Sequence, residues 1–179
     1  MRTIYLLGCA APPVFEIVAT VNLYRADDRQ VCVALTPTAA AWLGEQAVED
    51  LEHATGHPVR TRWRRPDEPK GGGWPAADGV ILAPATLHTI NALALGLTHS
   101  HVVGIGVEMM GRGVPLVVLP CVNTVLARHP RFGRSVAELR EAGVRVLLGD
   151  DGEEGFVPNE PGSGIREYPW ELALRAVTP

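Results

Sequence analysis

The sequence predicts an α/β fold of the three-layer, doubly wound, flavodoxin- or Rossmann-like class, with helices on both faces of one parallel sheet. Short apolar runs rich in β-branched residues, such as 79–82 and 114–119, are typical of strands buried on both faces. Segments with helical periodicity lie between these runs. With 179 residues, 46% hydrophobic and 20% charged, the chain is expected to form one domain over residues 1–179.

Two strand–helix units are predicted in the first part of the chain. Residues 3–9 and 30–35 are the expected strands. Between them, residues 14–24 carry apolar side chains at a helical period, and the prolines before them are tolerated in a first helical turn. Thr36 or Thr38 is expected to cap a second helix that runs through residue 43.

Residues 57–75 are predicted to be an irregular loop, because three prolines lie between Pro58 and Pro69 and three glycines follow. Loops of this length are usually functional or disordered. The loop contains the basic cluster 60–65, for which a solvated surface and a phosphate contact are both considered.

In the second half, helices are expected after each apolar run. The predicted strands are 79–82, 115–119 and 144–148, and the predicted helices are 89–95, 124–128, 135–142 and 169–177. Gly143 suits the C-cap before the last strand. The acidic, glycine-rich composition after residue 148 predicts a mobile tail segment over 149–168.

Composition excludes several classes of protein. The net charge of −4 gives no reason to expect nucleic acid, and no run reaches the ~20 apolar residues of a membrane span, so neither partner is predicted. The three cysteines form no CxxC pair, and the N-terminus lacks a signal-peptide layout, which together favour a reducing cytoplasm. His99 and His101 lack a third ligand, so no metal site is predicted.

Small and hydroxylated residues follow two of the predicted strands. Pro84, Ala85, Thr86 and Thr89 follow the first, and Cys121 and Asn123 follow the second. Because ligands of open α/β sheets bind beside the carboxyl ends of the strands, one shared site is expected there. The Thr86 hydroxyl is expected either to bond a flat ligand ring or to cap the next helix.

His88 is expected at the mouth of this site, as an acid, a base, an anion contact or an ordinary surface histidine. The first strand–helix turn, with Ala10 and Ala11 followed by two prolines, has no GxGxxG pattern and few donors, which makes it a poor phosphate cradle. Thr36 and Thr38 are expected to offset that loss.

Two segments carry a family resemblance. Residues 83–96, beginning Ala-Pro-Ala-Thr-Leu-His-Thr, resemble the Pro-Ala-Ser/Thr-Ala-Asn-Thr motif of homo-oligomeric flavin-containing cysteine decarboxylases. Residues 119–123, with His129-Pro130, resemble their Pro-x-Met-Asn motif, and 33–40 and 135–144 also fit. The family includes phosphopantothenoylcysteine and lantibiotic-peptide cysteine decarboxylases. The resemblance covers about residues 3–148 and implies a flavodoxin-like fold, FMN, and homotrimers or dodecamers whose interfaces complete the site.

This chain departs from the family pattern at its site, so the resemblance describes a divergent member. The family's catalytic histidine is replaced by Lys70, and the motif asparagine that contacts the substrate carboxylate is His88. Ala10, Ala11 and Pro12 replace the usual phosphate-binding hydroxyls. The second-motif asparagine is retained as Asn123, whereas its methionine is Val122 and a later aspartate is His99.

The expected function is therefore an FMN-binding flavoprotein that oxidatively decarboxylates a small-molecule thiol or a peptide C-terminal cysteine. His88 and Asn123 are the candidate catalytic residues. The resemblance and the strand ends together suggest a cofactor-binding set: Ala10, Ala11, Thr36, Thr38, Pro84, Ala85, Thr86, Thr89 and Cys121. The alternative is a non-catalytic flavin- or ligand-binding partner subunit; a flavin prenyltransferase-like protein is a third hypothesis. The apolar stretch 92–107 suits either a subunit interface or a core helix.

Overall fold

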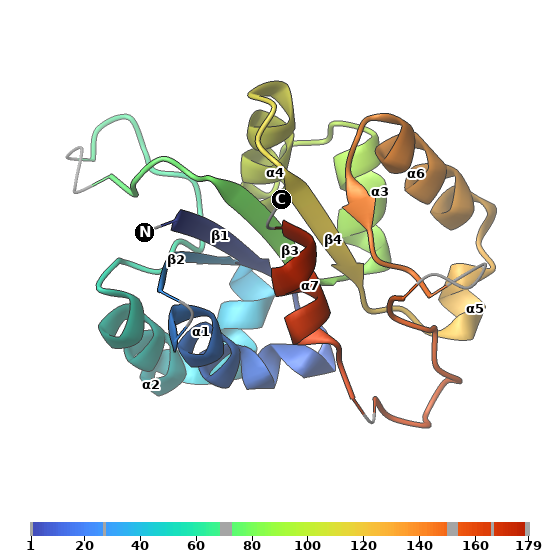
Figure 1. Ribbon diagram of the computed structural model, residues 1–179, viewed down its shortest axis with the longest axis horizontal. Helices are drawn as coiled ribbons and strands as arrows, with labels where there is room; N and C mark the ends of the chain where they lie inside the picture. The colour runs from blue at the N-terminus through green and yellow to red at the C-terminus, as the bar shows by residue number, and fades with distance from the viewer. Residues whose placement is uncertain (1, 27, 69–72, 150–153, 166, 178–179) are drawn as a thin grey trace.

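The computed structural model describes residues 2–26, 28–68, 73–149, 154–165 and 167–177. Five parallel strands form one sheet in the order β2-β1-β3-β4-β5 (Figure 1). This strand order is the flavodoxin-like order, which confirms the predicted doubly wound α/β class. The strands are β1 (Arg2–Gly8), β2 (Arg29–Leu35), β3 (Gly79–Ala85), β4 (Leu116–Pro120) and β5 (Arg145–Val146).

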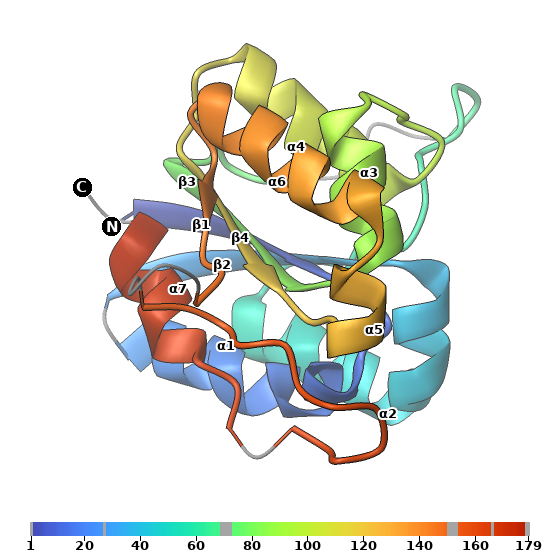
Figure 2. The same ribbon diagram turned by 90° about the vertical axis from the view of Figure 1, so that its right-hand side faces the viewer.

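Helices cover both faces of the sheet, as Figure 2 shows from the side. One face carries α1 (Ile17–Ala26), α2 (Pro37–Thr55) and α7 (Trp170–Val177). The other carries α3 (Leu87–Ala94), α4 (His101–Gly111) and α6 (Pro130–Glu141). Alternate residues of β1 enter two separate cores: Leu6 packs with the first helix layer and Leu7 with the second. The short helices η1 (Pro12–Glu16) and α5 (Thr124–Ala127) follow the ends of β1 and β4.

Three helical segments differ from the sequence expectation. The helix predicted from residue 14 starts as the 3-10 helix η1, whose first two residues are prolines that lack an N–H donor. Helix α2 continues to Thr55 across a kink at Gly44, where φ is 79°. Helix α4 was expected only as one of two alternatives for residues 92–107, because it is apolar on nearly every side and therefore shows little periodicity. It is buried within the chain, which favours the core-helix alternative for this stretch over a surface interface.

The loop that includes residues 57–68 and 73–75 packs beside β1 and β2 on the α3/α4 face. Arg60 extends β2 by two backbone hydrogen bonds, to Val33 and Leu35 (3.0 and 2.8 Å). Buried Trp74 packs edge-on against Tyr5, with ring centroids 4.8 Å apart, and the Arg60 guanidinium lies 4.1 Å above its ring. The aromatic side chains of this loop thus cover this face of the sheet at β1 and β2, as helices cover it at β3 and β4.

Hydrogen bonds hold the C-terminal segment against β4, α1 and η1. The Tyr168 hydroxyl donates to the Leu119 carbonyl (2.6 Å), and the Tyr24 hydroxyl donates to the Trp170 carbonyl (2.8 Å). The Trp170 indole N–H donates to Glu16 Oε2 at 2.9 Å. These bonds position the start of α7 beside η1 and the end of β4. No helix within the described ranges is long and apolar enough to cross a membrane.

We predict that Tyr168→Phe lowers the free energy of unfolding by about 1–3 kcal/mol, because it leaves the buried Leu119 carbonyl without its donor. Urea denaturation followed by circular dichroism measures the change. Val157→Ala, at a side chain that is 66% exposed, is the control and should stay within about 0.5 kcal/mol of wild type. Equal stabilities for the two variants would contradict this role of Tyr168.

Candidate functional site

The carboxyl ends of β1 and β3 form the topological switch point of the sheet. The chain leaves β1 toward the α1/α2 face and leaves β3 toward the α3/α4 face (Figure 2). Backbone hydrogen bonds tie the four strand ends together: Cys9 N to Pro84 O (3.2 Å), Thr36 N to Gly8 O (2.9 Å) and Cys121 N to Ala85 O (2.8 Å). The structure therefore brings the two predicted strand ends to one edge, where a ligand site is expected.

Thr86 is the N-cap of α3. Its Oγ1 accepts a hydrogen bond from Thr89 N (3.4 Å) and lies 3.1 Å from the Thr89 hydroxyl. Of the two expectations for Thr86, helix capping is the one that its contacts show. The first-turn amides of Leu87 and His88 have no acceptor inside the helix, because an α-helix leaves its first N–H groups unsatisfied. They are the donors that this strand end offers to a ligand.

Two thiols lie beside β3. Cys9 Sγ donates to the Thr89 hydroxyl at 3.3 Å, and both Cys9 and Cys121 are buried. Burial raises the pKa of Cys9 to about 11, against a smaller opposing effect of its hydrogen bond to Thr89. Burial also raises the pKa of Cys121 to about 12. Both thiols are therefore neutral and contribute packing surface rather than nucleophiles at this edge.

The first strand–helix loop offers few donors. The amides of Cys9 and Ala11 are engaged within the structure, with Pro84 O and Cys9 O, and Pro12 and Pro13 carry none. Ala10 is half-buried and Ala11 is buried. The expectation of a poor phosphate cradle thus has a geometric basis in the loop itself.

The start of α2 is more open. Thr36 Oγ1 accepts from Ala39 N (3.3 Å), so Thr36 is the cap of this helix, with Pro37 following it. Thr38 is exposed in the first turn, where a helix presents free N–H groups and the positive end of its dipole. Thr38 therefore provides a hydroxyl and a backbone donor near the end of β2.

Asn123 caps α5 at the end of β4. Its Oδ1 accepts from Leu126 N at 2.9 Å, so the group that it presents to a ligand is the Nδ2 amide donor. The following residue, Thr124, donates its backbone N–H to Asn159 O at 3.0 Å, which brings residues 154–165 alongside. Asn159 holds its own turn by donating from Nδ2 to the Glu160 and Gly164 carbonyls.

His88 is exposed in the first turn of α3, and its ring meets the ring of His99 edge-on, with centroids 5.7 Å apart. No local pattern predicts this pairing, since His99 lies in the loop before α4. Lys70, which occupies the position of the family histidine, lies outside the described residues. In the part of the chain that the structure describes, no group of three or more His, Cys, Asp or Glu side chains could hold a metal ion.

Exposed apolar side chains lie on elements that follow the strand ends. Phe15 of η1 and Trp42 of α2 stack nearly parallel, with centroids 6.2 Å apart, yet remain 61% and 47% exposed. Sequence reasoning missed this pair, because no periodic pattern links two residues on different helices. Further exposed side chains of this kind are Leu95, Leu97, Val125 and Leu126.

The chain belongs to the Flavoprotein family, whose sequence model matches residues 4–164. This confirms the suspected resemblance and supports a flavin as the class of cofactor. No curated protein sequence matches the chain.

Solved structures share the fold. The FMN-dependent cysteine decarboxylase SpaF superposes with a TM-score of 0.70 at 22% identity, over 99% of this chain and 95% of that one. The FMN-dependent cysteine decarboxylase TvaF from thioviridamide biosynthesis gives 0.68 at 21% identity, over 100% and 99%. A PPC decarboxylase variant complexed with pantothenoylaminoethenethiol gives 0.63 at 16% identity, over 82% and 81%.

Because the thiols are buried, we predict that they react slowly in the native protein. At pH 8 only about 0.1% of a thiol with a pKa near 11 is ionised, so Cys9 and Cys121 should react with an aromatic disulfide reagent far more slowly than a free thiol. Absorbance of the released thiolate measures the rate, and unfolding in guanidinium should make all three cysteines reactive. Rapid labelling of two or three thiols in the folded protein would contradict this description.

Proposed function

We propose that this protein binds FMN at the carboxyl edge of β1, β3 and β4 and oxidatively decarboxylates a small-molecule thiol or a peptide with a C-terminal cysteine. The observation that supports this most is the end of β3: small residues run directly into the open N-terminus of α3, and Asn123 follows the neighbouring strand. Family membership and the shared fold of FMN-dependent cysteine decarboxylases agree with it.

The residues at this edge suit a flat, anionic cofactor. Ala10, Ala11 and Ala85 lack bulk, so that a ring can approach the backbone closely. We place the ring beside Pro84, Thr86, Thr89 and Cys121, within reach of the α3 amides. The phosphate goes to Thr36 and Thr38, because the start of α2 has an open donor and a favourable dipole while the β1 loop does not.

Bound FMN supplies a two-electron acceptor for the hydride that the cysteine side chain loses. The protein's own groups orient the substrate and handle its charges. The Asn123 Nδ2 amide and the His88 ring N–H are donors suited to the substrate carboxylate, the group that leaves as carbon dioxide. The His88 ring also serves to accept or return a proton at the substrate thiol, a role that histidine commonly has in enzymes.

The second candidate is a non-catalytic flavin- or ligand-binding partner subunit. It is favoured by the shortage of donors in the β1 loop and by Lys70 at the position of the family's histidine. The visible spectrum of the purified protein separates the two proposals. A flavin spectrum, with FMN identified by mass after release, and turnover of a cysteine substrate support the first; flavin without turnover supports the second. Colourless protein that FMN does not restore would contradict both flavin proposals.

We also propose a homotrimer, or a dodecamer built from four trimers, in a reducing, cytoplasmic setting. The exposed Phe15–Trp42 pair and the apolar side chains of α5 support an interface beside the site. The three free buried thiols suit the reducing compartment.

Light scattering at micromolar concentration should give a mass of three chains or a multiple of three. Phe15→Asp combined with Trp42→Asp should shift that mass toward one chain, because two charges replace apolar contact area. Leu23→Asp, at a half-exposed side chain of α1, is the matched control and should leave the mass unchanged. A monomeric wild-type protein would rule out the proposed assembly.

We predict that His88→Ala abolishes turnover while fold and flavin content remain intact. His88→Asn should retain binding of the substrate carboxylate if a hydrogen-bond donor suffices, and should lose turnover if a proton must be transferred, because an amide does not titrate near neutral pH. Circular dichroism, the flavin spectrum and steady-state kinetics separate these outcomes. Lys70→Ala is the control and should matter little; the opposite pattern, with Lys70 essential and His88 dispensable, would show that His88 is misassigned.

We predict that Pro12→Ser tightens FMN binding about tenfold or more, because it adds an N–H and a hydroxyl in the loop after β1, which adjoins the proposed phosphate position through the Thr36 N to Gly8 O hydrogen bond (2.9 Å). One charge-assisted hydrogen bond contributes about 1.5–3 kcal/mol. Quenching of flavin fluorescence measures the dissociation constant. Pro12→Ala, which adds the N–H alone, should give a smaller gain. Unchanged affinity in both variants would show that a phosphate at the start of α2 lies out of reach of residue 12 and would contradict this prediction.

A further inference from the structure

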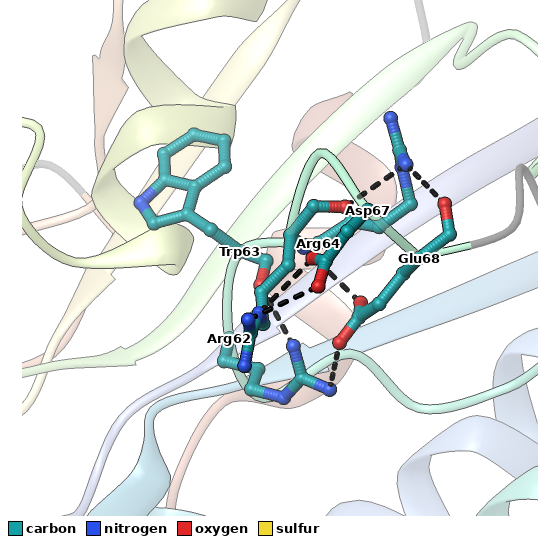
Figure 3. Close-up of polar contacts among 6 residues, drawn as sticks. Arg62, Trp63, Arg64, Asp67 and Glu68 are labelled. Atoms are coloured by element: carbon teal, nitrogen blue, oxygen red, sulfur yellow. Dashed lines mark hydrogen bonds and ion pairs between the residues drawn. The ribbon is translucent and has the colours of Figure 1, made fainter.

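Residues 60–68 form a compact arm in which Arg62, Arg64 and Arg65 have partners within the arm, whereas Arg60 lies over the Trp74 ring. Arg62 pairs with Glu68 (2.7 Å) and Arg65 with Asp67 (3.0 Å), while Arg64 Nη1 donates to the Arg65 and Glu68 carbonyls (3.0 and 2.7 Å; Figure 3). These ion pairs are exposed, so they fix the shape of the arm more than they hold it to the rest of the molecule. In the basic cluster 60–65, considered above as a phosphate contact, Arg62 and Arg65 are thus paired with Glu68 and Asp67.

Trp63 joins this arm to the body of the protein. Figure 3 shows its side chain directed at a neighbouring helix, away from the ion pairs. The indole packs on α4 at Gly104, where an added Cβ would lie 2.1 Å from Trp63 Cζ2, so only glycine admits this contact. Its ring meets the ring of His101 edge-on, with centroids 4.8 Å apart at 82°. Trp63 itself remains 46% exposed.

The contact leaves polar atoms of the α4 N-terminus without partners. His101 is 7% exposed, and among the described residues neither its Nδ1 nor Ser100 Oγ has a hydrogen-bond partner, although both atoms are buried. Burial, and then the positive charge of Arg60, lower the pKa of His101 to about 4. The docked arm therefore keeps His101 neutral at a mildly acidic pH at which an exposed histidine would be protonated.

We propose that the Trp63–His101 contact is a latch, which opens when His101 takes up a proton and frees the arm from α4. Trp74 keeps the adjoining part of the loop in place through Tyr5 and Arg60, and no histidine takes part in those contacts. Opening is therefore a local movement of the arm and leaves the sheet folded.

The pH range follows from the two states. In the open state His101 titrates near its ordinary value of 6.5, and in the docked state near 4. Above pH 6.5 the latch has its full strength. Each pH unit between 6.5 and 4 favours opening by up to about tenfold, toward a limit of about 300-fold well below pH 4, because the open state binds the proton more tightly.

The charged and titratable groups around His101 do not reverse this sign. Arg60 opposes the imidazolium in the docked state, and the acidic residues of the arm are already paired. The remaining groups on the packed elements are the Glu108–Arg112 ion pair of α4, Cys32 and Tyr5 of the sheet, whose pKa values are raised, and the exposed His88 and His99.

The test measures the coupling between Trp63 and His101 in the full-length protein. Ring-proton NMR of His101 should show a pKa near 4 in wild type and a rise to about 6 or above in Trp63→Ala. Trp42→Ala, which removes another half-exposed tryptophan, is the matched control and should leave the titration of His101 unchanged. An unchanged His101 titration in Trp63→Ala, or an equal rise in both variants, would overturn the proposal.

A second measurement follows the arm itself. With fluorotryptophan incorporated, the Trp63 resonance, assigned by its loss in Trp63→Phe, should shift as the pH falls from 8 to 4.5, while the buried Trp170 resonance reports that the fold persists. His101→Gln should remove this shift, and His99→Gln should retain it. A Trp63 shift that persists in His101→Gln would overturn the proposal, as would a resonance that does not respond to pH in wild type.

Discussion

The pairing of β1 with β2 on one side and β3 on the other is the constraint from which the site follows. At its end, Gly8 lies so close to its neighbours that an added Cβ would stand 2.8 Å from Leu35 Cδ2 and 3.1 Å from Ile17 Cδ1. The chain then turns away to one face while the chain after β3 turns to the other. The first-turn amides of α3 are left without helical acceptors at this edge, which is where ligands of open α/β sheets bind.

The first four strands were predictable because each contains an apolar run buried on both faces, whereas β5 is confined to Arg145–Val146, shorter than the predicted 144–148, and its Arg145 is exposed. The bounds of β3 were not: its run ends at Leu82 in the sequence, since Pro84 cannot donate a ladder hydrogen bond, yet the strand continues to Ala85 across a register shift against β4. Helix α4 could not be told from an exposed interface segment, for a different reason. An element that is apolar all round lacks the periodicity by which a helix is recognised.

The candidate site was also predictable only in part, because some of its features depend on local sequence and others on tertiary contacts. Thr36, Thr86 and Asn123 each cap the helix that follows a strand, and such caps are written in the local sequence. Other side-chain contacts join separate elements of the chain. The histidine pair 88/99, the stacked pair 15/42 and the latch pair 63/101 are of this kind, and no local pattern announced them.

The central claim is that one flavin site lies where β1, β3 and β4 end, with the phosphate shifted from the first loop to the start of α2. A crystal structure of the protein grown with excess FMN tests this claim most directly. We expect electron density for the ring beside Pro84 and Thr86 and for the phosphate at Thr36 and Thr38. A flavin bound elsewhere on the molecule, or a phosphate seated on the amides of residues 10–14, would contradict it.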